Sequence, residues 1–365
     1  MFNGLEVDML YVGNADCIVA TRWVNDVPTN VLIDGGNKSD IATLRPFLKS
    51  RGINFLHAVV CTHLHDDHSA GLLELLKDES IGIGTVYVHI PQLHVDASAV
   101  NKALRLTGDS TEADSFRKSL ATVNDLWVAC KARAIGIVEP FAGTTVGFLT
   151  VEGPSLQFYE QLLAEFTDAD RIKAIDFQQT LQKIWGDLHE NAVEALDTEL
   201  PENPQTTPEN NSSVILACIQ DDKKYLFTSD AGVPALEKAS EQYILTGCHW
   251  MQIPHHGSRR NINPALIKVF SPTIAWVSAE GTNKHPRRAV VNAFKNGGAI
   301  VHSTHYPTPT NMWISTGTVS SRVGYKPLVP LYDASLAKAA AASANPWLTL
   351  CSTPNENGTH QGHFG

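Results

Sequence analysis

Apolar and polar positions alternate near the N-terminus in the manner of half-buried strands. Three strands are predicted there by alternating, β-branched residues between turn signals, over residues 5–12, 16–23 and 29–34. Pro46 and Gly52 are expected to bracket a short helix. The pattern then predicts a strand over 55–62, an apolar helix over 69–77 and a strand over 84–90.

The middle of the chain has a helical pattern, and its second half returns to strands and helices. Helical segments are expected over 97–134 and 155–197, with a strand pair over 135–154 between them. Five later strands are predicted, near 212–220, 223–228, 249–253, 273–278 and 299–303. Helices should lie near 233–241, 263–270 and 286–296. Strands gathered at both ends with interleaved helices predict an α/β fold, an αββα sandwich of two sheets with helices outside.

The length and composition are compatible with one large domain. With 365 residues and 43% hydrophobic residues the chain can bury a sizeable core. We expect one main domain over 1–325 with a helical insertion over about 155–208, closed by the polar linker "PENPQTTPENN". Residues 326–365 are expected to form an extension with an Ala-rich helix, "SLAKAAAASA", and a frayed tail.

Charge and patterning exclude several classes of protein. A formal charge of −10 argues against a broad surface for duplex nucleic acid. No apolar run is long enough for a membrane span and no secretory signal is visible, so we expect a cytoplasmic protein. The six cysteines show no CxxC spacing and favour reduced, buried thiols.

The densest chemistry follows the apolar run Leu56–Cys61, in "CTHLHDDHSAG". His63 and His65 are two positions apart, so on a loop that leaves a strand both imidazoles can face one point, while Asp67 and His68 can face a neighbouring point. Imidazole and carboxylate ligands suit Zn²⁺ or Mn²⁺. The stretch therefore predicts two divalent metal ions about 3.5–4 Å apart. The simpler interpretation is a polar surface turn.

HxHxDH after a strand resembles the metallo-β-lactamase superfamily, which has an αββα fold with metals at one edge of the sheets. More narrowly, seven motifs occur in the order seen in the hydrolase domain of the competence DNA-uptake channel family ComEC and its free-standing relatives. They are "YVGNADCIVA", "NVLIDGG", "THLHDDHSAG", "NNSSVIL", "YLFTSDAG", "IPHHGS" and "KHP". The resemblance supports a fold more strongly than a substrate, because one fold hosts many chemistries.

The resemblance implies a role for each matching residue. His63 and His65 would hold the first metal, Asp67 and His68 the second, and Asp230 would bridge the two metals. A helix-capping role for Asp230 is the alternative. Asp34, in "LIDGG", would support the ligands through hydrogen bonds. In "IPHHGS" we favour His255 as a ligand of the second metal and His256 as an acid/base group, an order that the pattern leaves open.

The chain departs from the broader superfamily at the third histidine of the first site. No Gly-His occurs between 69 and 229, and "ENNSSVIL" stands in its place. Asn210, Asn211 or Ser212 is then expected to face the metals. His189 is a less favoured substitute. His89 and His94 are expected to be loop histidines, with a place beside the site as the alternative.

Cations cluster locally near the last motifs although the whole chain is acidic. Arg259 and Arg260 follow "HHGS", and Lys284, Arg287 and Arg288 surround His285. A helix beginning at Pro286 would add its N-terminal N–H groups, so phosphate recognition is expected. Solvated loop surface is the alternative. The candidate substrate contacts are Asn211, Ser212, Ser258, Arg259, Lys284, Arg287 and Arg288.

These residues predict a metal-dependent hydrolase. A metal-bridging water with a lowered pKa would attack as hydroxide, oriented by Asp67, while His256 or His285 protonates the leaving oxygen. We expect a phosphodiesterase or nuclease acting on DNA, RNA or a nucleotide. The alternative is a hydrolase of a lactone, thioester or β-lactam. The helical segments are expected to wall the substrate site, and a protein partner is a candidate activator.

Overall fold

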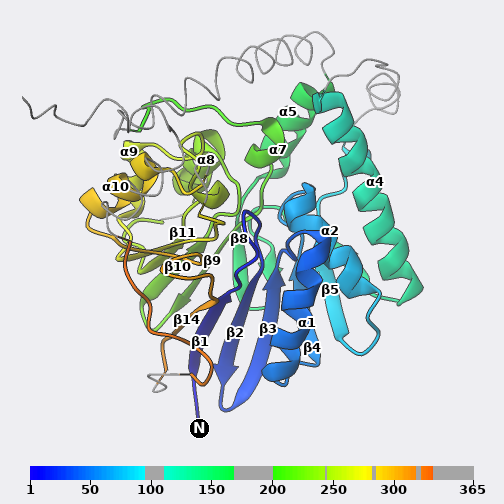
Figure 1. The fold of residues 1–365 in the computed structure, drawn as a ribbon. Coiled ribbons are helices and arrows are strands. Elements are labelled where there is room, and N and C mark those ends of the chain that lie inside the picture. Colours follow the sequence, from blue (N-terminus) through cyan, green and yellow to red (C-terminus); the bar gives the residue numbers. More distant parts are fainter. Residues whose placement is uncertain (95–110, 168–199, 243–244, 282–284, 318–321, 332–365) are drawn as a thin grey trace, which may run out of the picture.

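The computed structural model describes residues 1–94, 111–167, 200–242, 245–281, 285–317 and 322–331 (Figure 1). Those parts of the chain form two packed sheets with helices on both outer faces. Residues 332–365, which include the expected Ala-rich helix, lie outside the described residues, as do the larger part of the expected insertion and His189.

The first sheet has seven strands in the order β14-β1-β2-β3-β4-β5-β6. Their bounds are β14 Met312–Ser315, β1 Gly4–Met9, β2 Ile18–Val24, β3 Val27–Ile33, β4 Phe55–Val60, β5 Gly82–Tyr87 and β6 Gly136–Val138. The strands from β14 to β3 pair antiparallel, and those from β3 to β6 pair parallel.

The second sheet also has seven strands, in the order β13-β12-β11-β10-β9-β8-β7. Their bounds are β13 Ile300–Ser303, β12 Ile274–Val277, β11 Trp250–Gln252, β10 Lys223–Phe227, β9 Ile215–Gln220, β8 Leu149–Gly153 and β7 Thr145–Val146. Strands β10 to β13 are parallel to one another, whereas β7 to β10 are antiparallel.

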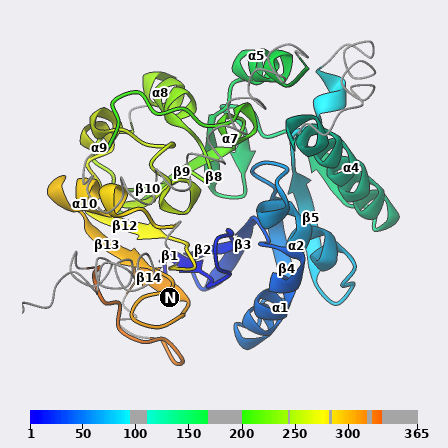
Figure 2. The same cartoon turned by 45° about the horizontal axis from the view of Figure 1, so that its top comes forward.

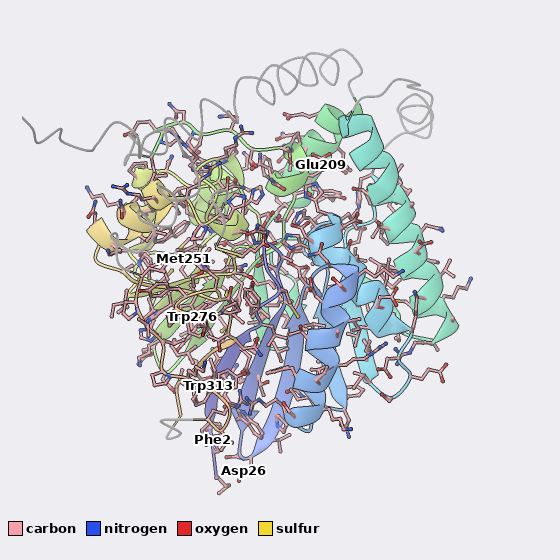
Figure 3. The ribbon with its side chains drawn as sticks, viewed as in Figure 1. Phe2, Asp26, Glu209, Met251, Trp276 and Trp313 are labelled. Atoms are coloured by element: carbon pink, nitrogen blue, oxygen red, sulfur yellow. The ribbon has the colours of Figure 1, made fainter. Side chains whose placement is uncertain are left out.

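The core between the sheets is made by alternate residues of both, as the period of two requires. Val7, Ile18 and Val60 of the first sheet pack against Phe227, Trp250 and Trp276 of the second. The two tryptophan rings meet edge to face with centroids 5.5 Å apart. Figure 3 shows Trp276 inside the sandwich, with Phe2 and Asp26 at one end and Glu209 at the other.

Helices cover both outer faces (Figure 2). The first sheet is covered by α1 (Ile41–Ser50), α2 (Asp66–Leu76) and α4 (Thr111–Ala132). The second is covered by α5 (Leu156–Thr167), α8 (Val233–Gln242), α9 (Pro264–Phe270) and α10 (Arg288–Asn296). Short helical turns are η1 (Lys38–Asp40), η2 (Pro91–Leu93), α7 (Pro208–Asn211) and η3 (His255–Gly257). The predicted αββα sandwich is confirmed.

Some predicted boundaries were wrong. Helix α1 begins at Ile41 and contains Pro46, because burial of Leu44, Phe47 and Leu48 offsets the one hydrogen bond that proline removes. Helix α10 begins at Arg288 rather than Pro286, since Arg287 is extended (φ −69°, ψ 135°) and caps it.

The strand β14, the segment 135–154 and the boundary at 325 also differ from, or add to, what the sequence predicts. Strand β14 was not predicted, because its partner β1 is about 300 positions earlier in the chain. The strand pair expected over 135–154 is three short strands that belong to both sheets. The domain boundary at 325 stays a prediction, although Leu331 is buried and its N–H donates to Val301 O at 2.8 Å.

Two further features of the described residues bear on the class of protein. None of the described helices is both long and apolar enough to cross a membrane. The five cysteines in the described part of the chain, Cys17, Cys61, Cys130, Cys218 and Cys248, are buried free thiols. Burial raises the pKa of Cys130 and Cys248 to about 11, which makes these thiols poor nucleophiles.

Candidate metal centre

The candidate site lies where the parallel strands of both sheets end. Asp34 follows β3, His63 follows β4, Asp230 follows β10 and His255 follows β11. Carboxyl ends of parallel strands meet at one sheet edge, and packing two such edges side by side brings residues far apart in sequence together.

The opening motif divides between a loop and a helix. His63 is in the loop, His65 caps α2 with extended backbone (φ −66°, ψ 148°), and Asp67 and His68 are in the first helical turn. The helix therefore begins at Asp66 and not at 69 as predicted. Acidic residues in the first turn favour this start, because they complement the positive end of the helix dipole.

Four side chains form one compact donor group, Asp67, His68, Asp230 and His256. His68 Nε2 is 3.7 Å from Asp67 Oδ2 and 3.5 Å from Asp230 Oδ1. His256 Nε2 is 3.4 Å from Asp67 Oδ2 and 3.9 Å from Asp230 Oδ1. Donors that share one tetrahedral zinc ion at 2.0–2.2 Å are about 3.4 Å apart, so these separations suit a single divalent metal.

A second group, His63, His65 and Asp230, adjoins the first. His63 Nε2 is 3.1 Å from His65 Nδ1 and 3.8 Å from Asp230 Oδ2. Asp230 therefore turns Oδ2 toward this group and Oδ1 toward the other. This is the arrangement of a carboxylate that bridges two metals.

Unpartnered atoms indicate that the larger group fits a cation. His68 Nε2, Asp230 Oδ1 and His256 Nε2 are buried and have no hydrogen-bond partner among the described residues. Buried polar atoms without partners are costly, and here all three face one another. A divalent metal between them would satisfy all three, so the residues fit the metals that the fold implies.

Asp34 orients the site from behind. Its Oδ2 accepts a hydrogen bond from His68 Nδ1 at 2.8 Å and from Thr62 Oγ1 at 2.6 Å, and its Oδ1 accepts from Thr62 N at 2.8 Å. A carboxylate on Nδ1 leaves Nε2 of His68 as the metal-binding nitrogen. The residue is fully buried.

Asp16 is a site residue that the sequence analysis missed. It is buried in the turn before β2, where its Oδ2 accepts from Gln252 Nε2 at 2.7 Å and its Oδ1 lies 3.8 Å from His256 Nδ1. The signal was available, since an aspartate in the otherwise apolar stretch "NADCIVA" needs a buried partner.

Burial and mutual charge shift the pKa values of these groups in opposite directions. Burial disfavours the charged His68 imidazole, but Asp230, Asp67 and Asp34 outweigh it and raise the His68 pKa well above its usual value. Burial would raise the pKa of Asp230, but His255, His68 and His256 hold it well below its usual value. Burial lowers the pKa of His63. Such divergent pKa values are typical of functional sites.

The structure places the two adjacent histidines, His255 and His256, in the reverse of their predicted order relative to the second donor group. His256, rather than His255, belongs to the group with Asp67 and His68. Its Nε2 lies 3.4 Å from Asp67 Oδ2 and 3.9 Å from Asp230 Oδ1. Its Nδ1 lies 3.1 Å from Ser278 O. Both histidines adopt left-handed backbone (φ 50° and 54°), an uncommon conformation that concentrates at functional sites.

The segment that replaces the third histidine contributes neighbours of His63 and His255. Ser213 Oγ lies 3.3 Å from His63 Nδ1, and Asn210 Nδ2 lies 3.2 Å from His255 Nδ1. Ser212 instead donates from Oγ to Glu209 O within its own turn, at 2.6 Å. Asn211 is buried with Oδ1 unpartnered among the described residues.

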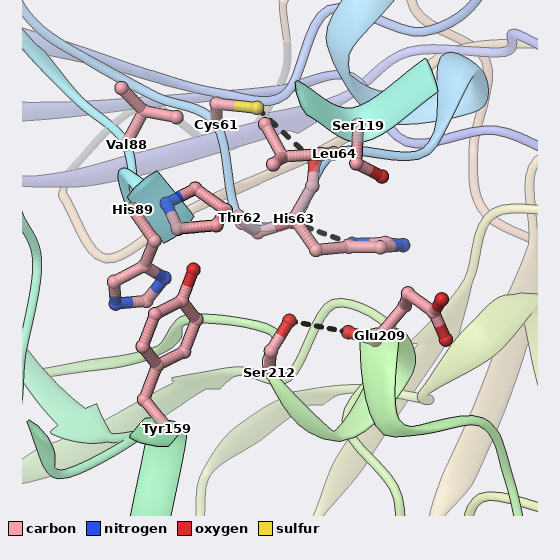
Figure 4. A pocket seen from close by; sticks show the side chains of 11 residues that line it. Cys61, Thr62, His63, Leu64, Val88, His89, Ser119, Tyr159, Glu209 and Ser212 are labelled. Atoms are coloured by element: carbon pink, nitrogen blue, oxygen red, sulfur yellow. Dashed lines mark hydrogen bonds between the residues drawn. The ribbon is translucent and has the colours of Figure 1, made fainter. Parts of the chain in front are cut away.

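A small cavity of about 20 Å³ adjoins His63 (Figure 4). His89, Ser119 of α4, Tyr159 of α5 and Glu209 help to line it, so both described helical segments reach the neighbourhood of the site. His89 stacks on Tyr159 at 4.4 Å, and burial lowers its pKa to about 3. His94 Nε2 lies 2.9 Å from Glu139 and outside the described donor groups.

Two arginine-bearing loops meet beside the histidines. The backbone N–H of Arg287 donates to Gly257 O at 3.0 Å, which ties the loop before α10 to η3. The His285 ring centroid is 5.7 Å from that of His255 and 6.1 Å from that of His256. Ser258 Oγ accepts from Arg260 N within its loop. Lys284 lies outside the described residues.

Comparisons with known proteins agree with this architecture. Residues 18–129 match the family model for the metallo-beta-lactamase superfamily. A comparison with curated proteins gave no match. Two solved structures are similar over 86% of this chain. The metallo-beta-lactamase fold protein YhfI from Bacillus subtilis is 11% identical over 100% of its own chain, with a TM-score of 0.42. A diphosphatase from the PhnP family is 9% identical over 99% of its chain, with a TM-score of 0.41.

The dizinc lactonase AidC is similar over 59% of this chain and 56% of its own, with 11% identity and a TM-score of 0.31. Similarity of this degree carries no argument about substrate. The two-sheet sandwich has the expected metallo-β-lactamase fold, and residues 18–129 match the model of that superfamily. Hydrolysis at the His/Asp groups is a proposal that rests on their chemistry. The narrower resemblance to the competence-channel hydrolase stays a prediction.

Proposed function

We propose that the protein is a dinuclear metal-dependent phosphodiesterase that acts on nucleic acid or a nucleotide. His63 and His65 would hold a first metal, and Asp67, His68 and His256 a second, with Asp230 shared between them. Zn²⁺ or Mn²⁺ suits these nitrogen and oxygen donors. Two divalent metals supply Lewis-acid stabilisation of a phosphoryl oxygen and lower the pKa of water toward neutrality.

The observation that carries the choice of phosphate is the junction of the two arginine-bearing loops. The hydrogen bond from Arg287 N to Gly257 O brings the segments with Arg259 and Arg288 beside the metal-binding histidines. Guanidinium groups bind phosphate oxygens in a bidentate manner. Arg259, Arg287 and Arg288 are therefore proposed to bind the phosphate.

The proton donor is proposed from the remaining histidines. Since His256 lies among the metal donors, His285 takes the role of protonating the leaving oxygen. Asp67 would orient the attacking water. Ser258, Asn211 and Ser212 stay proposed substrate contacts, with the hydroxyl of Ser212 already bonded to Glu209.

A hydrolysis panel tests the proposal. The substrates are bis-p-nitrophenyl phosphate, single- and double-stranded DNA, RNA, a cyclic dinucleotide, a lactone and a β-lactam, each with Zn²⁺, Mn²⁺ or EDTA. We expect phosphodiester cleavage that EDTA and Asp67→Ala abolish. Arg259→Ala should lower kcat/KM for the phosphodiester about 10–100-fold, the value of one charge-assisted contact.

The control variant is Arg45→Ala, because Arg45 pairs with Asp78 at the opposite end of the strands and should leave turnover unchanged. Turnover of the lactone or β-lactam alone would overturn the phosphodiesterase proposal in favour of an acyl hydrolase. Equal effects of Arg259→Ala and Arg45→Ala would remove the argument from the arginine loops.

A further inference from the structure

The first donor group is one side chain short of the second. It contains His63, His65 and Asp230, whereas the second contains four residues. No Gly-His motif occurs between residues 69 and 229 to supply a third histidine there, and the residues that replace it contact the histidine rings rather than completing the group. We propose that His255 completes the first metal site, an inference that rests on the proposed dinuclear centre.

The position of His255 relative to Asp230 assigns it to the first site. Its Nε2 lies 3.5 Å from Asp230 Oδ2, the same oxygen that lies 3.8 Å from His63 Nε2. His256 contacts the other oxygen, Oδ1. The two adjacent histidines thus reach the two oxygens of the bridging carboxylate separately. A separation of 3.5 Å is that of two donors on one tetrahedral metal, about 3.4 Å.

Hydrogen bonds determine which nitrogen of His255 is available. Asn261 Nδ2 donates to Asp230 O at 2.7 Å, so its Oδ1 must face His255 Nδ1, 2.9 Å away, and accept its proton. Nε2 then carries a lone pair that faces a carboxylate oxygen. Two such acceptors are held together favourably by a proton or a metal cation between them, and the lowered pKa of His255, caused first by burial, disfavours the proton. This is the usual way in which a histidine ligand is oriented from behind.

Asn210 fits this tautomer once its side-chain amide is turned by 180°. Its Nδ2 lies 3.2 Å from His255 Nδ1, which is already a donor, while its buried Oδ1 has no partner among the described residues. Turning the amide by 180° places the oxygen against Nδ1–H and lets Thr206 Oγ1, 2.8 Å from the same amide atom, donate to it. The single Nδ1–H of His255 would then be shared between Asn261 Oδ1 and Asn210 Oδ1, and both acceptors favour the tautomer with a free Nε2.

His255 contacts only the Asp230 corner of the first group in this structure. Binding a metal therefore requires its ring to move toward His63. The His255 side chain is less enclosed than that of its neighbour, because it is 26% exposed whereas that of His256 is 3% exposed. We infer that the first metal binds by closure of His255 and is held more weakly than the second.

Metal content tests the inference independently of turnover. The full chain is dialysed against buffered free Zn²⁺ and bound zinc is counted by mass spectrometry, with the absorption of Co²⁺-loaded protein as a second readout. We expect two metals in the wild type. His255→Ala should weaken one of them at least about 10–100-fold, leave the other unchanged and alter the cobalt spectrum.

Three further variants keep the test decisive. Asn261→Ala should weaken the same metal even if His255→Ala fails to fold, and His256→Ala should weaken the other one. His249→Ala, at the far end of β11, is the matched control and should change neither. Wild-type affinity for both metals in His255→Ala and Asn261→Ala would overturn the inference and leave the dinuclear proposal intact. A wild-type count below two would overturn both.

Discussion

At the scale of single residues, chemical type alone does not separate the roles of neighbouring side chains. His255 and His256 are identical and adjacent, yet each contacts a different oxygen of Asp230. Consecutive left-handed backbone conformations turn the two rings toward the two sides of that carboxylate. The backbone therefore decides which carboxylate oxygen each histidine ring faces.

Asp34 reaches the candidate metal centre only through its hydrogen bonds to Thr62 and His68. Its removal should lower both the unfolding free energy and the metal affinity. Asp34→Ala leaves Thr62 N and His68 Nδ1 without their buried acceptor, which should cost about 2–4 kcal/mol of unfolding free energy. Metal affinity should fall about 10–100-fold. Denaturant unfolding and zinc titration measure both, with the exposed neighbour Asp66→Ala as control. A stable variant with normal affinity would contradict the positioning role.

Glu152 is a buried carboxyl outside the candidate metal-binding groups, and it should make stability depend on pH. Burial raises its pKa to about 7 from 4.5, and its Oε2 lacks a hydrogen-bond partner among the described residues. The folded state therefore binds this proton more tightly than the unfolded state, so stability is complete below pH 4.5 and declines as the pH rises through 7.

Glu152→Gln should abolish that decline. We expect the variant to exceed the wild type at pH 8 by on the order of 1–2 kcal/mol, with little difference at pH 4. Urea unfolding across this pH range measures the effect, and exposed Glu237→Gln is the matched control. Parallel pH profiles for wild type and Glu152→Gln would show that the carboxyl does not titrate in this way.

At the scale of elements, the site depends on how closely α2 approaches the loop after β3. A Cβ at Gly71 would lie 1.9 Å from Gly35 O, so only glycine allows this contact. Gly35 N donates to His68 O at 2.8 Å and Gly71 N donates to Gly36 O at 2.9 Å. These bonds hold the first turn of α2 against Asp34, and they set the orientation of His68.

Gly71→Ala should therefore damage both fold and site. The added methyl forces α2 away from the loop, and we expect a loss of about 1–3 kcal/mol or more together with weaker metal binding. Gly136→Ala on the edge strand β6 is the control, since a Cβ there meets nothing within 4 Å. Thermal unfolding and zinc titration of the two variants should differ clearly. Similar behaviour would mean that the close approach is not required.

At the scale of the whole molecule, the segment after β14 is joined to the start of the chain by buried charges. Arg322 Nη1 donates to both oxygens of Asp8, at 2.8 and 2.7 Å, and its Nη2 lies 3.3 Å from Glu6 Oε2. Asp8 and Glu6 are 1% and 5% exposed. Tyr325 and Trp313 also donate to these carboxylates. These ion pairs and hydrogen bonds hold the segment with Arg322 and Tyr325 against strand β1 of the first sheet.

Removing the cation should leave two buried carboxylates without their counter-charge. Arg322→Ala should lower the unfolding free energy by about 3–5 kcal/mol near neutral pH. Asp8→Asn in the same chain should recover part of that loss, because one uncompensated charge is removed. Chemical denaturation of the single and double variants forms the test. An additive further loss in the double variant would contradict the charge argument.

Much of the fold and of the candidate site could be predicted from local patterns. Alternation identified most strands, and "HLHDDH" after an apolar run indicated metal ligands because its spacing is local. Prediction failed where a strand or side chain has its partner far away in the sequence, and where two adjacent residues of the same type have different contacts. Strand β14 pairs with β1 from the other end of the sequence, and Asp16 shows its role only beside Gln252.

The sequence by itself determined the αββα class and the residue types of the candidate metal centre, because hydrophobic period and ligand chemistry are properties of short segments. Only the tertiary structure decided how Asp230 is shared, which histidine faces which of its oxygens, and how Asn261 orients His255. Those choices depend on distances between loops from different strands and sheets. Such distances are set by packing, which no local pattern encodes.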